Sequence, residues 1–256
     1  MWDAVQYGRY GDERSRPFFE LLARVGAEKP GYVADLGCGP GNLTVRLAER
    51  WPGAEVVGVD SSPQMIEAAL SAQPSAGVSF ALGDVRDWRP ARPPDVLVSN
   101  AVLQWVPGHR DLVVRWAGQL AAGGWLAFQL PGNFGQPSQA ILRELAAAPR
   151  WRPLLREAEL NRQSDSPEGY AELLGRPGFE VDAWETTYVH VLHGADPVVE
   201  WVKGTALRPV LAVLDDERAA AFLADYGERV RAAYPPRPFG TLFPFRRVFT
   251  VVHRIG

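Results

Sequence analysis

The stretch that most constrains the fold lies near the start of the chain, where a short apolar run leads into an acid and three alternating glycines. It spans residues 33–41 and reads VADLGCGPG. The apolar residues predict a buried strand, and the glycines permit a tight turn whose backbone N–H groups can approach a ligand. Amphipathic residues at 43–48 predict a helix directly after the turn. A nucleotide cofactor is therefore expected at this turn.

The alternation of apolar runs and amphipathic stretches continues to residue 130. The second apolar run is uninterrupted, as expected for a strand that is covered on both faces. Short connections between successive strands and helices favour an α/β fold with a doubly wound parallel sheet. The expected strands are Tyr32–Leu36, Ala54–Asp60, Val78–Leu82, Asp95–Asn100 and Trp125–Leu130.

The pattern is less regular after residue 131. We expect helices at 138–147 and 166–175, strand segments at 179–184 and 187–191, and a last strand at 248–253. Two helical segments between Asp196 and about Tyr234 predict a helical insertion before the last strand. We therefore expect a single domain over residues 1–256, with an N-terminal arm at 1–29 and the insertion, at about 194–238, forming a substrate cap.

Composition and charge restrict the partners. The net charge is −3, so we expect no nucleic acid partner, because nucleic acid binding needs clustered Lys and Arg. No apolar run approaches the ~18 residues of a membrane span, and Cys38 is the single cysteine. A cytoplasmic protein without a membrane partner is expected. The four histidines lack cysteine partners and paired helical spacing, so no metal site is expected. The sequence gives no indication of the oligomeric state.

The glycine turn alone does not choose the cofactor. The dinucleotide fingerprint has Gly or Ala three residues after its second glycine, and here that position is Asn42. Asp60, which closes the second strand, would accept hydrogen bonds from ribose hydroxyls in either cofactor class. The choice depends on Asp35 and on Asp84, which follows the third strand. The alternative for Asp84 is a turn acid that caps its own backbone.

Residues 35–41, together with Asp60 and Asp84, resemble the motifs of class I S-adenosylmethionine-dependent methyltransferases, and the resemblance covers residues 30–131. It implies S-adenosylmethionine as the cofactor. It also implies a Rossmann-like methyltransferase fold with a mostly parallel seven-stranded sheet, whose last strand runs antiparallel. This cofactor has no phosphates and needs acceptors for an ammonium group and hydroxyls, which agrees with Asp35 beside the glycines.

The resemblance also implies roles by position. The turn would contact the methionine portion, Asp60 the ribose and Asp84 the adenine amino group, while Val85 would pack on the adenine ring. Met65 matches family members in which this residue lines the adenine side, and packing in the core is the alternative. The predicted cofactor residues are Asp35, Gly37, Gly39, Gly41, Asp60, Ser61, Met65, Asp84, Val85, Asn100, Ala101 and Trp105.

Four further stretches, at 13–17, 100–105, 186–190 and 207–209, resemble a narrower group, the bacterial trans-aconitate 2-methyltransferases. The chain departs from that group at Gly132 and at 245–246. The resemblance implies O-methylation of a carboxylate of trans-aconitate, a small tricarboxylate, giving the monomethyl ester and S-adenosylhomocysteine. A methyltransferase for another small acid or phenol, a binding module without methyl transfer and a dinucleotide oxidoreductase remain as alternatives, and Asn42 argues against the last.

A carboxylate acceptor fits the residues present. With a pKa of ~4 it is ionised at pH 7 and needs no general base, so we expect positioning only and no catalytic acid or base. Arginines would hold the carboxylates that do not react, since guanidinium binds carboxylate in a bidentate manner. Arg14 would arrive from the N-terminal arm as a lid. The predicted substrate residues are Tyr7, Arg14, Tyr188, His190, Arg208 and Arg247.

Overall fold

The computed structural model describes residues 11–73, 76–156, 158, 160 and 163–256, with residues 11–14 described by their backbone alone. The chain forms two compact units. Unit 1 comprises Met1–Pro131, Asp165–Glu185 and Arg247–Gly256, and unit 2 comprises Gly132–Ser164 and Thr186–Arg246. The predicted insertion at about 194–238 falls inside unit 2, and its role as a substrate cap stays a prediction.

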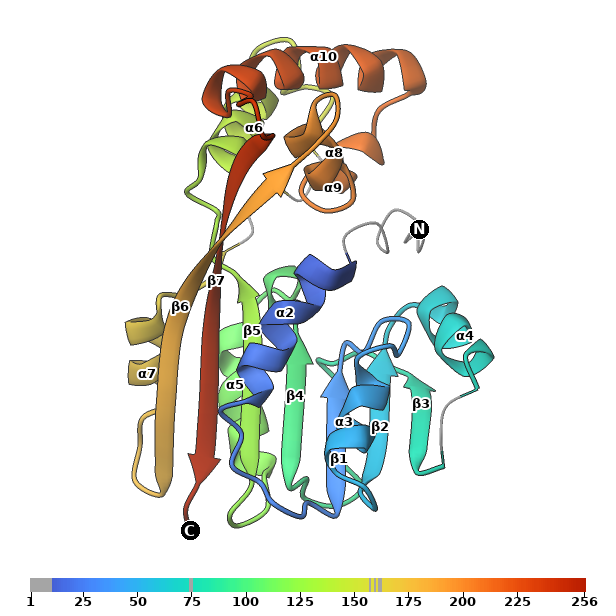
Figure 1. Ribbon diagram of the computed structural model, residues 1–256, viewed down its shortest axis with the longest axis vertical. Coiled ribbons are helices and arrows are strands. Elements are labelled where there is room, and N and C mark those ends of the chain that lie inside the picture. The colour runs from blue at the N-terminus through green and yellow to red at the C-terminus, as the bar shows by residue number, and fades with distance from the viewer. Residues whose placement is uncertain (1–10, 74–75, 157, 159, 161–162) are drawn as a thin grey trace. The chain divides into compact units, whose positions relative to one another are not determined.

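A seven-stranded sheet has the strand order β3-β2-β1-β4-β5-β7-β6 (Figure 1). Strands β1 to β5 pair in parallel, and β7 runs antiparallel to β5. The expected α/β sheet with an antiparallel last strand is therefore confirmed. The strands are β1 (Tyr32–Leu36), β2 (Glu55–Asp60), β3 (Val78–Leu82), β4 (Val96–Asn100), β5 (Trp125–Pro131), β6 (Phe179–Leu192) and β7 (Thr241–Arg254).

The last two strands are longer than predicted, and each contributes residues to both units. Strand β6 is continuous across the two segments predicted at 179–184 and 187–191. Strand β7 begins at Thr241 instead of Val248. Its first residues alternate between buried and partly buried, but Pro244 interrupts the run, and proline inside an apolar run normally argues against a strand.

Helices cover the parallel sheet on both faces: in Figure 1, α2 and α3 lie in front of the strands and α5 lies behind them. Serines cap two helices, since the hydroxyls of Ser62 and Ser166 accept hydrogen bonds from Met65 and Gly169 N–H. The helices of unit 1 are α2 (Gly11–Leu22), α3 (Thr44–Arg50), α4 (Pro63–Ser71), α5 (His109–Gln119) and α7 (Pro167–Leu174), with a 3₁₀ turn at Leu103–Trp105.

The two faces of β5 differ in chemistry. Leu126, Phe128 and Leu130 pack in the main apolar cluster with residues of α5 and α7, and the rings of Phe128 and Tyr170 meet edge to face at 5.1 Å. Alternate residues of a strand point to opposite faces, so Gln129 lies on the other face. Gly26, which follows α2, is pressed against Trp125 on that face, where an added Cβ would lie 2.8 Å from the ring.

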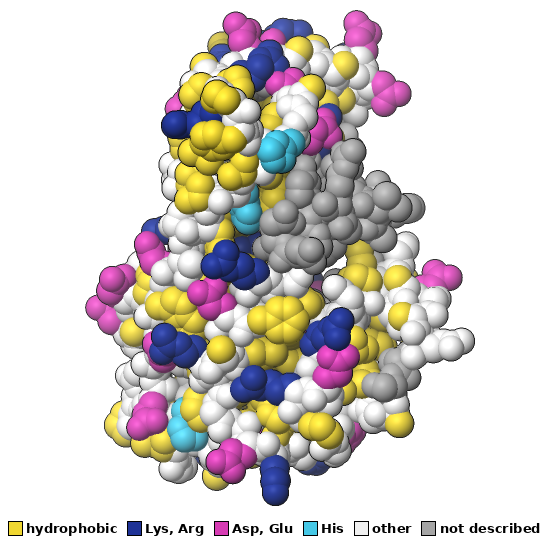
Figure 2. All heavy atoms as spheres, in the orientation of Figure 1, with side chains coloured by type: hydrophobic (Ala, Val, Ile, Leu, Met, Phe, Trp, Pro, Cys, Tyr) yellow, Lys and Arg dark blue, Asp and Glu magenta, His cyan; other side chains and the backbone are white. Residues whose placement is uncertain are grey.

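Unit 2 has its own core. The Tyr226 hydroxyl donates to the Ser138 carbonyl at 3.1 Å, and Trp151 and Phe222 pack edge to face at 5.1 Å. Figure 2 shows hydrophobic side chains on the visible face of this unit, and Phe239 is 56% exposed. The helices of unit 2 are α6 (Pro137–Ala147), α8 (Pro197–Lys203), α9 (Arg208–Leu211) and α10 (Asp216–Ala233).

A buried acid joins β1 to α3. Asp35 is 2% exposed, and Thr44, the first residue of α3, donates its hydroxyl to Asp35 Oδ2 at 2.6 Å. The pKa of Asp35 is raised to about 6: burial is the largest cause, the Thr44 hydrogen bond opposes it, and nearby Asp60 adds a smaller upward contribution. The strand and the helix on either side of the glycine turn are therefore held together by a carboxyl group that titrates in mildly acidic solution.

We predict that Asp35→Asn changes the pH dependence of stability. Because the pKa of Asp35 is higher in the folded chain than its ordinary 3.8, its contribution to stability is complete below pH 4 and is lost as pH rises through 6. Asparagine keeps an oxygen acceptor for Thr44 and does not titrate. Denaturant unfolding at pH 4 to 7 should show the variant gaining roughly 3 kcal/mol relative to the wild type. A constant difference between the two proteins would contradict the raised pKa.

Candidate functional site

The three glycines of the turn differ in what surrounds them. All have positive φ, at 83° for Gly37, 56° for Gly39 and 79° for Gly41. A Cβ at Gly37 would lie 2.1 Å from the Val102 side chain, and one at Gly41 would lie 2.5 Å from the Phe80 ring. At Gly39 an added Cβ would meet no atom of the described residues within 4 Å. Packing therefore requires glycine at the first and third positions, and the middle position is open to a ligand.

Asp60 closes β2 directly beside this turn. Its carboxylate accepts hydrogen bonds from Gly39 N–H at 2.9 Å and from Ser62 N–H at 2.8 Å. A carboxylate has about four acceptor positions, so Asp60 can still accept from the hydroxyls of a ligand. Ser61 is exposed, whereas Met65 is 6% exposed within α4. The burial of Met65 agrees with the alternative in which it packs in the core.

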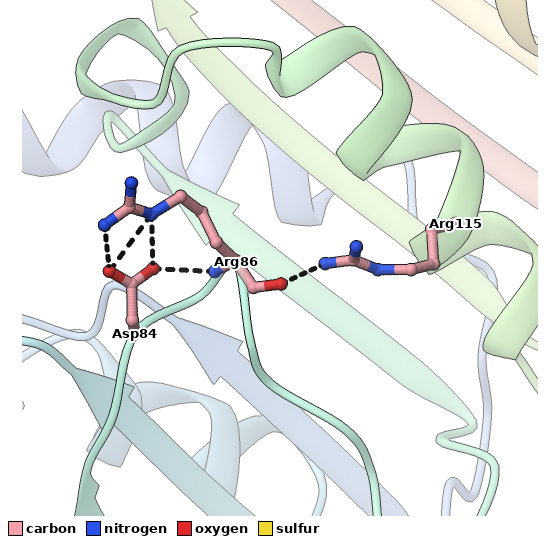
Figure 3. A network of polar contacts seen from close by, with 3 residues as sticks. All are labelled: Asp84, Arg86 and Arg115. Carbon is pink, nitrogen blue, oxygen red and sulfur yellow. Dashed lines mark hydrogen bonds and ion pairs between the residues drawn. The ribbon is translucent and has the colours of Figure 1, made fainter.

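Asp84 follows β3 and is paired with Arg86 (Figure 3). Arg86 Nη2 lies 2.6 Å from Asp84 Oδ2, and the Arg86 backbone N–H donates to Oδ1 at 2.8 Å. These hydrogen bonds lower the pKa of the Asp84 carboxyl. Arg115 of α5 donates to the Arg86 carbonyl. Val85, which lies between Asp84 and Arg86 in the chain, is buried. Asp84 therefore caps its own turn, as the alternative reading requires, and any adenine would share this carboxylate with Arg86.

The ion pair between Asp84 and Arg86 is weak enough for a ligand to share the Asp84 carboxylate. The Arg86 and Asp84 side chains are 61% and 31% exposed, and ion pairs between exposed side chains contribute about 0–1 kcal/mol. A ligand that donates to Asp84 would thus compete with a small free energy. The ion pair leaves the predicted adenine contact open.

A strained residue follows β4. Ala101 has a φ of 59°, which is uncommon for a residue with a Cβ. Its N–H donates to the Gln129 carbonyl at 2.8 Å, and its carbonyl accepts from Gln104 Nε2 at 2.6 Å. The next residues form the 3₁₀ turn that carries Trp105. Strain of this kind is often found at ligand sites, and Ala101 is one of the predicted cofactor residues.

A chain of three polar side chains crosses the sheet from Asn100 through Gln129 to Arg247. Gln129 Nε2 donates to Asn100 Oδ1, and Arg247 Nη1 donates to Gln129 Oε1 at 3.1 Å. The pairing explains the arrangement: Asn100 lies opposite Gln129, and Arg247 lies opposite Pro131, two residues further along the same face. Gln129 was not among the predicted site residues. The sequence feature that could have identified it is a single amide side chain inside an otherwise apolar strand.

The predicted residues of unit 2 include a pair of stacked rings. Tyr188 and His190 stack with ring centroids 6.4 Å apart, and His190 stacks on Trp201 at 4.6 Å. Phe245 lies 5.9 Å from Trp201, in the same cluster. Arg208 begins α9, and burial lowers the pKa of its guanidinium. Trp201 and Phe245 were not among the predicted substrate residues.

The structure places the predicted cofactor residues at one edge of the sheet, because they follow the carboxyl ends of parallel strands β1 to β4. Of the predicted substrate residues, Tyr188, His190 and Arg208 belong to unit 2 and Arg247 to unit 1. Tyr7 lies outside the described residues, as does the side chain of Arg14.

The described residues contain neither a candidate metal site nor a helix that could span a membrane. No group of three or more His, Cys, Asp or Glu side chains is placed to hold a metal ion within the described ranges. In the same part of the chain, no helix is both long and apolar enough to cross a membrane.

Comparison with solved structures agrees with the fold. A chain from the complex of the Haloferax volcanii Trm112 methyltransferase activator and a methyltransferase superposes with a TM-score of 0.61 at 19% identity, covering 99% of this chain and 95% of that one. Haemonchus contortus phosphoethanolamine N-methyltransferase 2, solved with S-adenosylhomocysteine, gives a TM-score of 0.55 at 16% identity, with 93% of this chain and 52% of that one covered.

Sequence comparison identifies the family more specifically than the structural comparison does. A family model described as a methyltransferase domain matches residues 10–183. A trans-aconitate 2-methyltransferase of Streptomyces avermitilis is 53% identical, over 99% of this chain and 97% of the relative. A protein of the same name from Mycobacterium tuberculosis is 48% identical, over 98% of this chain and 96% of the relative. The chain therefore belongs to the methyltransferase-domain family and, within it, to the trans-aconitate 2-methyltransferases.

Proposed function

We propose that this protein transfers a methyl group from S-adenosylmethionine to a carboxylate of trans-aconitate, which yields the monomethyl ester and S-adenosylhomocysteine. The observation that carries the proposal is the 53% identity to a trans-aconitate 2-methyltransferase over 99% of this chain and 97% of the relative. A match over nearly the whole of both chains includes unit 2 as well as the cofactor motifs. It thereby supports the acceptor as well as the methyl donor.

The residues present fit the cofactor. Gly39 offers an open position in the turn, and Asp60 keeps acceptor capacity beyond its two backbone hydrogen bonds. Asp84 presents a partly exposed carboxylate after β3. We propose that these residues hold the methionine, ribose and adenine parts of S-adenosylmethionine, respectively. When bound, this cofactor supplies an electrophilic methyl group on a positively charged sulfur.

The acceptor requires orientation and not deprotonation. A carboxylate is ionised at pH 7, so the protein has only to align one oxygen with the methyl group and keep water out. We propose that Arg247 and Arg208 hold the other carboxylates by charge-assisted hydrogen bonds. Both guanidiniums are shielded from solvent, Arg247 at 6% exposure and Arg208 at partial burial, and shielding strengthens their attraction for an anion.

Product analysis tests the reaction directly. The purified protein, S-adenosylmethionine and trans-aconitate should give an ester heavier than the acid by one methylene, together with one equivalent of S-adenosylhomocysteine. A panel of other small acids and phenols, offered at the same concentration, should react more slowly. Preferred turnover of another acid would reassign the acceptor, and no product from any of them would leave only cofactor binding.

We predict that Gly39→Ala weakens cofactor binding while leaving the fold intact. The matched control is Gly53→Ala, because Gly53 also has positive φ, at 95°, with nothing within 4 Å of an added Cβ. Both alanines bear a similar left-handed backbone cost of about 1 kcal/mol, so their Tm values should agree. Calorimetry with S-adenosylhomocysteine should show binding at least about tenfold weaker for Gly39→Ala only. Equal affinities would place the cofactor away from this glycine.

We predict that Arg208→Ala and Arg247→Ala lose methyl transfer and keep cofactor binding. Removing a hydrogen bond to a charged group costs about 1.5–3 kcal/mol, which corresponds to a fall of roughly tenfold to a hundredfold in kcat/KM for the acid. Arg231→Ala is the control, since Arg231 is 55% exposed and pairs with Asp196. Normal turnover by both variants would remove these arginines from the acceptor site.

A further inference from the structure

We infer that Gln129 is a positioning residue for methyl transfer, which holds Arg247 in one orientation and turns the amide N–H₂ of Asn100 toward a carboxylate ligand. The inference rests on the proposed function and adds to it a residue that neither the motifs nor the predicted site included. Gln129 is fully buried on β5 and contacts both neighbours directly. It links a side chain predicted to bind substrate with one predicted to bind cofactor.

The direction of this hydrogen-bond chain follows from chemistry. Amide oxygen and nitrogen atoms are hard to tell apart by shape alone, but arginine has donors and no acceptor. Gln129 must therefore present its oxygen to Arg247, as it does at 3.1 Å. Its N–H₂ then faces Asn100, which must present its own oxygen in return. The guanidinium thus sets the orientation of an amide two hydrogen bonds away.

The N–H₂ group of Asn100 is a donor at the end of this chain of hydrogen bonds. Asn100 is partly exposed at the end of β4, whereas Gln129 and Arg247 are buried. Among the described residues, the Asn100 amide nitrogen has no hydrogen-bond partner. A donor held in this way suits a carboxylate oxygen. The reaction offers carboxylates from two sources, the acid and the methionine part of the cofactor, and the chemistry of recognition is the same for both.

Strand geometry makes Gln129 effective in this role. Three neighbouring strands contribute one residue each, and their registers place all three side chains on the same face. A buried amide between two packed strands has little freedom to rotate, so the orientation of Arg247 is fixed before substrate arrives. Preorganisation of this kind lowers the cost of aligning an acceptor.

Two substitutions separate positioning from packing. Gln129→Leu removes both hydrogen bonds and leaves the Arg247 charge in place. Gln129→Glu keeps the shape and an acceptor, but it cannot donate to Asn100 when ionised, and it neutralises Arg247. Thr250→Val is the control, because Thr250 is fully buried on β7 and its hydroxyl lacks a hydrogen-bond partner within the described chain. Tm values show whether each variant folds.

We expect KM for trans-aconitate to rise about tenfold in Gln129→Leu and further in Gln129→Glu, with kcat lowered in both and unchanged in Thr250→Val. A purely structural role would instead order the variants by their Tm. Calorimetry with S-adenosylhomocysteine identifies the carboxylate that Asn100 binds. Unchanged affinity in Gln129→Leu assigns the donor to the acid, and weaker binding assigns it to the cofactor.

A measurement without turnover separates this inference from the proposed function. The guanidinium N–H signal of Arg247, assigned by its loss in Arg247→Lys, should exchange slowly with solvent in the wild type and rapidly in Gln129→Leu. Failure of the wild type to methylate trans-aconitate would overturn the proposed function alone. An unchanged Arg247 signal, or folded Gln129 variants with the KM, kcat and S-adenosylhomocysteine affinity of the wild type, would overturn the positioning role.

Discussion

The parallel pairing of β1 with β2 and β4 is the contact on which the site depends. Leu36 lies opposite Val59, whose carbonyl accepts hydrogen bonds from both Gly37 and Cys38 N–H at 2.7 and 3.0 Å. The end of one strand therefore fixes the turn after its neighbour. A shift of one residue in this register would move every side chain to the other face. It would also separate Gly39 from the Asp60 carboxylate, on which the open position of the turn depends.

The first half of the fold could be predicted because its signals are local. Each of the first five strands is a short apolar run, and Ser62 and Ser166 begin helices at the expected residues. The turn was identifiable because positive φ and close packing require glycine at Gly37 and Gly41. The positive φ is a local property of the backbone at each glycine, whereas the packing against Val102 and Phe80 involves residues far along the chain.

Interactions between distant residues could not be predicted in the same way. The start of β7 was missed because Pro244 interrupts its pattern. The Gln129 contacts depend on residues 29 and 118 positions away. A single amide in an apolar strand indicates that a buried partner exists. It does not identify that partner until the strand order places β7 beside β5.

The two sides of the site differ in how their polar groups are held. Asp60 is fixed by backbone N–H groups of Gly39 and Ser62, and most substitutions leave a backbone donor in place. Arg247 donates a hydrogen bond to a side chain, that of Gln129, and one substitution can remove this acceptor. The position of the Asp60 carboxylate is therefore robust to changes in sequence, whereas the hydrogen bond from Arg247 to Gln129 is lost when that one amide side chain is replaced.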